Sequence, residues 1–242
     1  MAIKIIVNGA SGRMGTEAVK AISNDTQLEL VASLTRKDDL TAQIQKHNAD
    51  VVVDFTVASV VNDNITQIIN AGARAVVGTS GLLPEQIKSL QQQCLEKKLG
   101  CIIAPNFSIG AVLMMRYAQD AAKYLNHVEI VELHHDGKED SPSGTAIKTA
   151  DMIAEVRQDI ADISSRETIP GSRGAIKNNI HIHALRLPGL VAHQQVIFGG
   201  VGETLTIRHD SINRECFMPG VLLACKKVME TDELVYGLEH II

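Results

Sequence analysis

The sequence predicts an α/β protein in which a doubly wound parallel sheet is joined to an α+β domain with an open mixed sheet. Three observations predict this class. Short apolar runs alternate with amphipathic helical patterns over residues 1–107, as in a parallel sheet with helices on both faces. A glycine-rich loop directly follows the first apolar run. Strand patterns then succeed one another between residues 180 and 209 without helices between them, which indicates a second architecture.

The first architecture rests on short β-rich runs separated by helical patterns. The strands that we expect cover residues 3–7, 28–34, 51–53, 75–77 and 101–104. Helical periodicity follows the glycine-rich loop, where Val19 and Ile22 share a face, and recurs at Val60, Ile65, Ile68 and Ile69. Pro84 opens another helix, because proline suits a first helical turn. The order strand, helix, strand predicts parallel pairing.

The second architecture begins with a helix over residues 109–125 and a strand over 128–133. A second helix opens at residues 142–145 and runs to about Arg157, followed by a polar loop over 158–178. Strands are then expected at 180–186, 191–198 and 203–209, with a hairpin connection at 199–202. The last helical pattern covers 216–230, and its apolar side carries Val221, Leu222, Cys225 and Val228.

Composition narrows the function classes. The 242 residues are 45% hydrophobic and 21% charged, which excludes disorder, and the net charge of −5 argues against a nucleic-acid partner. Four scattered cysteines without a C-x-x-C pair predict neither disulfides nor a zinc site. No run approaches the ~18–20 apolar residues of a membrane span, and the N-terminal residues lack a signal-peptide layout. We therefore expect a cytoplasmic protein with no membrane partner and no metal.

The glycine-rich loop predicts a dinucleotide site. Its residues are Gly9, Ala10, Ser11, Gly12, Arg13, Met14 and Gly15, spaced G-x-x-G-x-x-G. In a Rossmann-like fold this position holds a pyrophosphate, because glycines let the backbone approach and the helix offers free N–H groups. The alternative is a glycine-rich turn without a ligand. Its position after the first strand of a βαβ pattern favours the dinucleotide.

The end of the second strand bears on which nicotinamide cofactor binds. A site for NAD expects an acidic residue there to bind the ribose hydroxyl, whereas this chain has Thr35, Arg36 and Lys37. A hydroxyl and two cations suit a 2′-phosphate, which favours NADPH over NADH. A solvated basic turn is the alternative. Asp38 and Asp39 follow closely and are themselves candidates for contact with a ribose.

Two further loops follow expected strands, at the edge where open α/β sheets bind ligands. They are Gly78-Thr79-Ser80 and Ala104-Pro105-Asn106-Phe107. Both are candidates to line the ribose and the nicotinamide. Ordinary turn chemistry between strand and helix explains them equally well.

The densest polar cluster predicts a site for an anionic substrate. His134 and His135 leave a strand, Lys138 follows, and Ser143-Gly144-Thr145 begins a helix. A helix N-terminus and a lysine attract carboxylates, and histidine donates protons near neutral pH. A polar surface loop is the alternative. A metal site is disfavoured, because neighbouring histidines on a strand point apart.

This cluster resembles the signature of the dihydrodipicolinate reductase family. The matching residues are Glu132-x-His134-His135-x-x-Lys138-x-Asp140-x-Pro142-Ser143-Gly144-Thr145-Ala146. The resemblance covers nearly the whole chain. It extends to Gly9 to Gly15, Asp54-Phe55-Thr56, Val77-Gly78-Thr79-Ser80-Gly81, Ala104-Pro105-Asn106-Phe107, His183-Ala184-Leu185-Arg186, Val191-Ala192-His193, Gly202-Glu203 and Arg208-His209.

The resemblance implies an activity and two domains. Residues 1–107 and 213–242 would form the dinucleotide-binding domain, and 108–212 the substrate domain, whose open sheet would pack against its copies in a homotetramer. The reaction would be the NAD(P)H-dependent reduction of 4-hydroxy-tetrahydrodipicolinate to tetrahydrodipicolinate, in diaminopimelate and lysine biosynthesis. Hydride would come from C4 of the nicotinamide.

The resemblance also assigns roles to residues. His134 would be the catalytic acid and Lys138 a second proton-donating, substrate-polarising residue. The substrate carboxylates would be held by His135, Lys138, Ser143, Gly144 and Thr145. Cofactor positions would be Gly9 to Met14, Gly78 to Ser80 and Ala104 to Phe107.

This chain departs from the family pattern at two places. Many relatives carry an acidic residue where Thr35 stands, so cofactor preference is not transferable. Many also carry a basic residue where this chain has Asp136-Gly137, which predicts a weaker positive field around the substrate. Two competing functions are a different small NAD(P)-dependent reductase and a non-catalytic NADP-sensing protein. Neither accounts for the whole cluster from His134 to Thr145.

Overall fold

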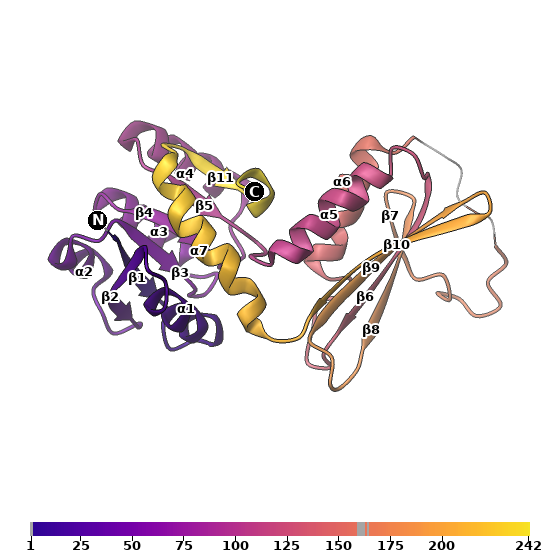
Figure 1. Ribbon diagram of the computed structural model, residues 1–242, viewed down its shortest axis with the longest axis horizontal. Coiled ribbons are helices and arrows are strands. Elements are labelled where there is room, and N and C mark those ends of the chain that lie inside the picture. The colour runs from indigo at the N-terminus through magenta and orange to yellow at the C-terminus, as the bar shows by residue number, and fades with distance from the viewer. Residues whose placement is uncertain (1, 159–162, 164) are drawn as a thin grey trace. The chain divides into compact units, whose positions relative to one another are not determined.

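The structure, a computed structural model, describes residues 2–158, 163 and 165–242. The chain divides into two compact units, coloured along the chain in Figure 1. Unit 1 comprises Met1–Ile109 and Arg214–Ile242, and unit 2 comprises Gly110–Asn213. These junctions fall within two residues of the boundaries expected at 107/108 and 212/213.

Unit 1 contains a six-stranded sheet in the order β11-β5-β4-β3-β1-β2, and its neighbouring strands are paired in parallel. The strands are β1 (Ile3–Asn8), β2 (Leu28–Leu34), β3 (Val51–Asp54), β4 (Arg74–Val77), β5 (Cys101–Ile103) and β11 (Leu234–Tyr236). The first five confirm the predicted strands. β11 was not predicted, because three residues are too few to show a periodic pattern.

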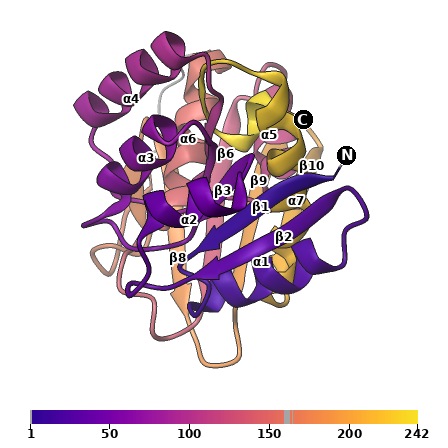
Figure 2. The same cartoon turned by 90° about the vertical axis from the view of Figure 1, so that its left-hand side faces the viewer.

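Helices cover both faces of this sheet. They are α1 (Arg13–Ser23), α2 (Leu40–His47), α3 (Val61–Asn70), α4 (Pro84–Lys97) and α7 (Met218–Lys227). α1 packs with α7, and α3 packs with both α2 and α4, on opposite sides of the strands (Figure 2). Ile5, Ile6 and Val7 are all fully buried. Successive strand residues point to opposite faces, so both faces of β1 are covered.

One predicted helix of unit 1 needs correction, and two helical elements were not predicted. α2 was not predicted; only Leu40 and Ile44 are buried in it, and Asp39 caps its start by accepting from Ala42 N (3.0 Å). The helix expected over 216–230 is α7 flanked by 3₁₀ turns, η1 (Arg214–Phe217) and η2 (Val228–Glu230). Pro219 explains the first break, since a proline fits the first turn of a helix and not its interior. A further 3₁₀ turn, η3, covers Leu238–His240.

Unit 2 contains a five-stranded mixed sheet in the order β10-β9-β6-β8-β7. Its elements are α5 (Ile109–Ala121), β6 (His127–His134), α6 (Gly144–Val156), β7 (Ala175–Lys177), β8 (Ile180–Arg186), β9 (Ala192–Gly200) and β10 (Glu203–Ser211). β6 runs parallel to β8, and the other pairs are antiparallel. α5 is shorter than predicted, because the chain turns after Ala121. β7 lies inside the expected polar loop, of which residues 159–162 and 164 lie outside the described residues.

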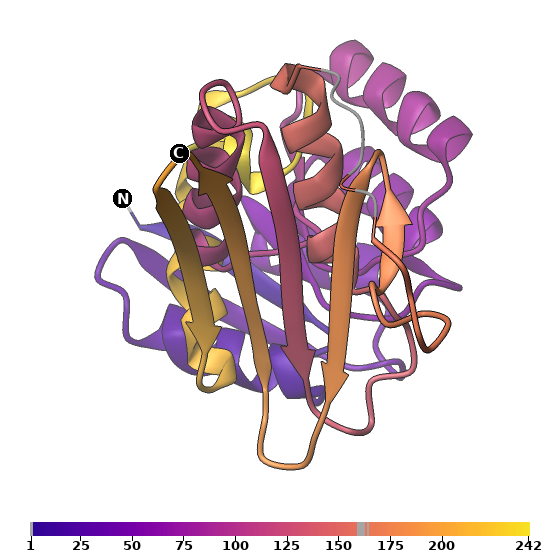
Figure 3. The ribbon, with the colours of Figure 1, turned by 90° about the vertical axis from the view of Figure 1, so that its right-hand side faces the viewer.

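The two faces of this mixed sheet differ. Figure 3 shows α5 and α6 behind the strands, with no described helix over the face toward the viewer. On β6, Val128, Ile130 and Glu132 are buried, and the residues between them are not. This alternation identifies the side of β6 that packs under the helices. In the described part of the chain, no helix is long and apolar enough to cross a membrane.

Candidate active site

The loop between β1 and α1 is built around two glycines. Gly9 has φ +82°, and a Cβ there would lie 2.5 Å from the Phe55 carbonyl oxygen. A Cβ on Gly15 would overlap the Gly9 carbonyl oxygen, so α1 packs against the loop only with glycine at that position. Both residues bring backbone close to backbone, as a phosphate-binding turn requires.

The start of α1 presents unpaired N–H groups. Gly12 is its N-cap and has no side chain to bond them, and the first turn contains no acidic residue. The first N–H groups of a helix lack intrahelical partners, and together with the helix dipole they attract anions. Local geometry therefore suits a phosphate at this end of α1.

A groove of about 1570 Å³ runs over these elements of unit 1. It brings together most of the predicted cofactor residues, namely Gly9, Ser11, Gly12, Arg13, Met14, Thr35, Arg36, Lys37, Gly78, Thr79 and Ser80. Ala10 is not on its wall; its N–H donates to the Leu34 carbonyl oxygen (2.9 Å). The loop Ala104 to Phe107 is not on the wall either. Phe107 instead packs edge-on against Phe55, which does line the groove, with ring centroids 5.9 Å apart.

A buried carboxylate lies beneath this groove. Asp54, at the end of β3, has no exposed surface. Its Oδ2 accepts from Asn8 Nδ2 (2.9 Å) and Asn64 Nδ2 (2.8 Å). Its Oδ1 accepts from the N–H and hydroxyl of Thr56 (3.1 and 2.6 Å) and from Thr79 Oγ1 (3.0 Å). These neutral donors join the ends of β1, β3 and β4 to α3. From the sequence, Asp54 was recognisable only within the motifs that carry the family resemblance.

The loop after β2 uses its two carboxylates locally. Asp38 Oδ2 accepts from the Thr35 N–H (2.8 Å) and hydroxyl (3.0 Å), and these bonds lower the pKa of Asp38. Asp39 caps α2. Arg36 and Lys37 are exposed, and within the described part of the chain neither has a carboxylate partner. The side chains of Arg36 and Lys37 are thus available to a ligand, whereas the carboxylates of Asp38 and Asp39 already accept hydrogen bonds from backbone N–H groups.

In unit 2, the predicted catalytic residue His134 contacts a second buried carboxylate, that of Glu132. Glu132 and His134 share one side of β6, because they are two residues apart. Glu132 has no exposed surface, and its Oε2 lies 2.5 Å from His134 Nδ1. Its Oε1 accepts from the Ser143 N–H (3.1 Å) at the start of α6. One carboxylate therefore contacts both the histidine and the helix.

Arg186 completes this cluster from β8. It stands opposite His134 in the parallel register. Its two terminal nitrogens donate to the two oxygens of Glu132, each at 2.8 Å, and Nη2 also donates to the Asp140 carbonyl oxygen (2.8 Å). Burial raises the pKa of Glu132, but the bonds from Arg186 and His134 outweigh it and hold that pKa below its ordinary value.

The electrostatics of His134 follow from the same contacts. Burial lowers its pKa, and the Glu132 carboxylate opposes that effect without cancelling it. The ring is 13% exposed. Because a carboxylate is an acceptor, Nδ1 carries the hydrogen shared with Glu132, which leaves Nε2 for an outside partner.

The loop after β6 carries the other predicted substrate residues. Lys138 donates its N–H to the His135 carbonyl oxygen (3.2 Å), and its Nζ lies 2.6 Å from Asp140 Oδ1. The Ser143 hydroxyl caps α6 by accepting from Ala146 N (3.2 Å). Gly144 and Thr145 form the first turn of that helix. The predicted residues thus gather at one end of unit 2, and the described residues contain no cluster of metal ligands.

Sequence reasoning did not assign Glu132 and Arg186 to the site, although both lie in the quoted motifs. For Glu132 a signal existed, since it precedes His134 by two residues on the same side of a strand. For Arg186 there was none, because 54 residues separate it from Glu132 and the β6–β8 pairing alone brings them together.

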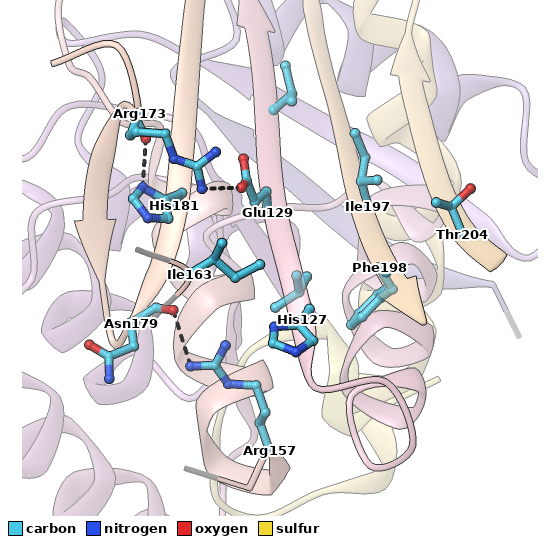
Figure 4. Close-up of a pocket in the computed structure, with 13 residues that line it drawn as sticks. His127, Glu129, Arg157, Ile163, Arg173, Asn179, His181, Ile197, Phe198 and Thr204 are labelled. Carbon is cyan, nitrogen blue, oxygen red and sulfur yellow. Dashed lines mark hydrogen bonds and ion pairs between the residues drawn. The ribbon is translucent and has the colours of Figure 1, made fainter. Parts of the chain in front are cut away.

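A separate hollow of about 260 Å³ lies on unit 2 around Glu129 (Figure 4). Several of the polar groups around it contact one another or nearby backbone. Arg173 Nη2 lies 2.5 Å from Glu129 Oε1, the Arg173 carbonyl oxygen is 2.7 Å from His181 Nδ1, and Arg157 Nη2 donates to the Asn179 carbonyl oxygen (3.2 Å). None of the predicted site residues lines this hollow.

Comparisons with known proteins bear on the whole chain. The family described as dihydrodipicolinate reductase, N-terminus, matches residues 3–107, and the one described as dihydrodipicolinate reductase, C-terminus, matches residues 110–242. A 4-hydroxy-tetrahydrodipicolinate reductase from Coxiella burnetii (strain RSA 493 / Nine Mile phase I) is 55% identical over 242 residues, and one from Legionella pneumophila (strain Paris) is 52% identical over 243. Both alignments cover 100% of each chain.

Solved structures agree. A dipicolinate-bound dihydrodipicolinate reductase from Paenisporosarcina sp. TG-14 superposes with a TM-score of 0.93 at 44% identity, over all of both chains. A probable dehydrogenase from Thermotoga maritima has a TM-score of 0.67 at 12% identity, over 98% of this chain and 92% of that one, and shows the fold alone. The matches confirm the predicted fold class and the resemblance drawn from the sequence.

Proposed function

Because this chain belongs to the dihydrodipicolinate reductase family, we propose that it reduces 4-hydroxy-tetrahydrodipicolinate with His134 as the proton donor. The protein is an NAD(P)H-dependent oxidoreductase of the diaminopimelate and lysine pathway. The proposed reaction removes water from the substrate and adds one hydride and one proton, giving tetrahydrodipicolinate. Unit 1 would hold the cofactor and unit 2 the substrate.

The residues of unit 1 fit a nicotinamide dinucleotide. Because Gly9 and Gly15 have no side chains, the backbone around the start of α1 is accessible, and its free N–H groups suit the pyrophosphate. The bound cofactor supplies the hydride from C4 of its nicotinamide. The groove extends to Gly78, Thr79 and Ser80, which would contact the ribose. Ala104 to Phe107 support this wall through the contact between Phe107 and Phe55.

We propose a preference for NADPH over NADH. Arg36 and Lys37 are exposed on the groove, and a guanidinium with an ammonium matches a 2′-phosphate. Asp38 bonds to Thr35 and Asp39 caps α2, so the acids that compete for a ribose are already used in the loop. NADH remains a usable cofactor, since its pyrophosphate would make the same contacts.

Unit 2 would hold the two substrate carboxylates. Lys138 supplies a positive charge, and the α6 start at Gly144 and Thr145 supplies N–H groups and the positive end of a helix dipole. Ser143 contributes through its backbone and cap, and His135 flanks the same loop. Lys138 would exchange Asp140 for a substrate carboxylate.

The contact that carries the proposal is the one between Glu132 and His134. It presents Nε2 of the ring outward while Glu132 also bonds the start of α6. In the free protein, burial keeps the pKa of His134 below its ordinary value. A dianion arriving beside the ring raises that pKa, since nearby negative charge favours the protonated form. His134 thus takes up its proton when the substrate binds.

The assembly and the location are also proposals. One face of the unit 2 sheet carries no described helix, and the family resemblance implies that such a face packs against copies of the chain in a homotetramer. A cytoplasmic location follows from the pathway.

A coupled assay tests the function. Dihydrodipicolinate synthase generates the substrate, and the absorbance of NADPH or NADH reports its reduction. We expect higher kcat/KM with NADPH, and a fall in kcat of about 10²–10⁴-fold in His134→Gln, the usual contribution of a general acid. NADPH affinity should stay unchanged. If neither cofactor is oxidised, the proposed function is wrong. If kcat of His134→Gln equals that of wild type, His134 is not the proton donor. A higher kcat/KM with NADH overturns the proposed cofactor preference.

A further inference from the structure

We infer that Glu132 and Arg186 form the positioning element of this active site. Glu132 fixes the ring and the protonated nitrogen of His134, and Arg186 holds Glu132 charged and in place. The inference rests on the proposed role of His134 as proton donor. It assigns a task to two residues that contact neither hydride nor proton acceptor in the proposed reaction.

The contacts of Glu132 show what it fixes. Each of its two oxygens has two hydrogen-bond partners. Oε2 contacts His134 Nδ1 (2.5 Å) and Arg186 Nη1 (2.8 Å). Oε1 accepts from the Ser143 N–H (3.1 Å) and from Arg186 Nη2 (2.8 Å). A carboxylate held at four points in the protein interior cannot rotate without losing several bonds. The His134 ring and the start of α6 therefore keep one geometry relative to each other.

The bond at Nδ1 decides which nitrogen of His134 works as the acid. With the hydrogen on Nδ1 shared with Glu132, the second hydrogen of the protonated ring is on Nε2. After Nε2 gives its proton away, the neutral ring retains the Nδ1 hydrogen. The opposite tautomer would set an imidazole lone pair against the Glu132 carboxylate, which is repulsive.

Arg186 stabilises the ionised form of the buried Glu132 side chain. A buried carboxylate without a cation loses much of its hydration free energy, and a two-pronged guanidinium contact compensates this loss. Arg186 also donates to the Asp140 carbonyl oxygen (2.8 Å), and the Asp140 carboxylate lies 2.6 Å from Lys138 Nζ. A continuous path of contacts thus joins His134 to Lys138 through Glu132, Arg186 and Asp140.

The sequence offers a matched control on the same strand. Glu129 is the other glutamate of β6 with an arginine and a histidine as partners, Arg173 (2.5 Å) and His183 (2.7 Å). It lies three residues before Glu132, so it points to the opposite side of the strand. Glu129→Gln therefore makes the same chemical change beside a different histidine.

The decisive measurement is made without substrate. Heteronuclear NMR of ¹⁵N-histidine-labelled protein reports the tautomer and the titration of His134, and the His134→Gln spectrum assigns its signals. The charged groups that act on this ring are Glu132, Lys138 and Arg186. In Glu132→Gln we expect the Nδ1–H preference to weaken and the His134 midpoint to move to lower pH, since a negative charge is lost. Glu129→Gln should leave both unchanged.

Kinetics provide the second readout. We expect kcat of Glu132→Gln to fall by about 10–100-fold, the scale known for outer partners that orient metal-bound imidazoles, while the KM for NADPH stays within twofold. If Glu132→Gln does not fold, Arg186→Lys serves instead: it keeps a cation and loses the two-pronged contact, and should lower kcat with a smaller shift in the His134 titration.

Two outcomes separate the inference from the proposed function. The inference is overturned if the His134 tautomer and midpoint are unchanged in Glu132→Gln and in Arg186→Lys, and if kcat of these two variants stays within twofold of wild type. An active His134→Gln overturns the role of His134 as acid, while the NMR result still shows whether Glu132 sets the ring. Loss of kcat in Glu129→Gln equal to that in Glu132→Gln would also overturn the inference, because the effect would then not depend on contact with His134.

Discussion

Each unit buries a carboxylate at or near the end of a strand, and the two carboxylates are stabilised in different ways. Asp54 in unit 1 accepts hydrogen bonds from neutral donors on Asn8, Asn64, Thr56 and Thr79. Glu132 in unit 2 is held by charged or chargeable groups, Arg186 and His134, together with one backbone N–H. Neither side chain has exposed surface.

The difference matches what each unit is proposed to do. Neutral donors around Asp54 hold three strand ends together, and they have no group that gains or loses a proton near neutral pH. The partners of Glu132 include a histidine that does. A carboxylate that shapes a binding groove is therefore surrounded by amides and hydroxyls, whereas one that supports proton transfer is linked to a titratable ring.

Of the changes considered for the two carboxylates, removal of Arg186 should lower the unfolding free energy most. Arg186→Met leaves Glu132 buried without its cation, and losing one partner of a buried ion pair costs about 3–5 kcal/mol of unfolding free energy. Urea unfolding followed by circular dichroism measures it. Lys123→Met is the control, because it removes the cation of an exposed pair with Asp120, and exposed ion pairs contribute little to stability. A loss below about 1 kcal/mol in Arg186→Met would show that the pair does not stabilise unit 2.

Asp54→Asn should have the next largest effect, and mainly on the cofactor. The new amide N–H₂ would face donors on Asn8, Asn64, Thr56 or Thr79, which leaves one or more buried donors unpaired at a cost of about 1–3 kcal/mol. We expect weaker NADPH binding in a fluorescence titration and a largely unchanged kcat at saturating cofactor. Asp63→Asn, an exposed change in the first turn of α3, is the control. Equal NADPH affinity in all three proteins would contradict the proposal that Asp54 shapes the groove.

The smallest expected effect is the pH dependence of stability that arises from Glu132. Its pKa in the folded protein is below the ordinary value, despite burial, because of Arg186 and His134. Its charge therefore stabilises the fold above the ordinary glutamate range, and this contribution is lost as pH falls through the lowered pKa. The difference in unfolding free energy between wild type and Glu132→Gln should thus stay constant from pH 7 to about pH 5 and shrink as the pH falls further, through the lowered pKa. A difference that stays constant from about pH 5 to about pH 3 would show that ionised Glu132 adds no stability.

Local patterns predicted much of the fold and part of each site. β1 to β5 are short, mainly apolar runs, and β8 and β9 carry apolar residues in alternation, so local patterns identify these strands. The glycine loop and the helix start at Ser143 are equally local, because capping and tight turns depend on a few adjacent residues. α2 and β11 were missed, since α2 buries only Leu40 and Ile44 and β11 has three residues.

Motif residues at short spacing are enough to identify the family, the fold class and the candidates His134 and Lys138. Which groups support these side chains depends on how distant segments of the chain pair in the folded protein. Asn8 meets Asp54 across 46 residues, and Arg186 meets Glu132 across 54. Strand pairing creates these contacts, and the free energy of a buried carboxylate depends on the donors that surround it in space rather than on its neighbours along the chain.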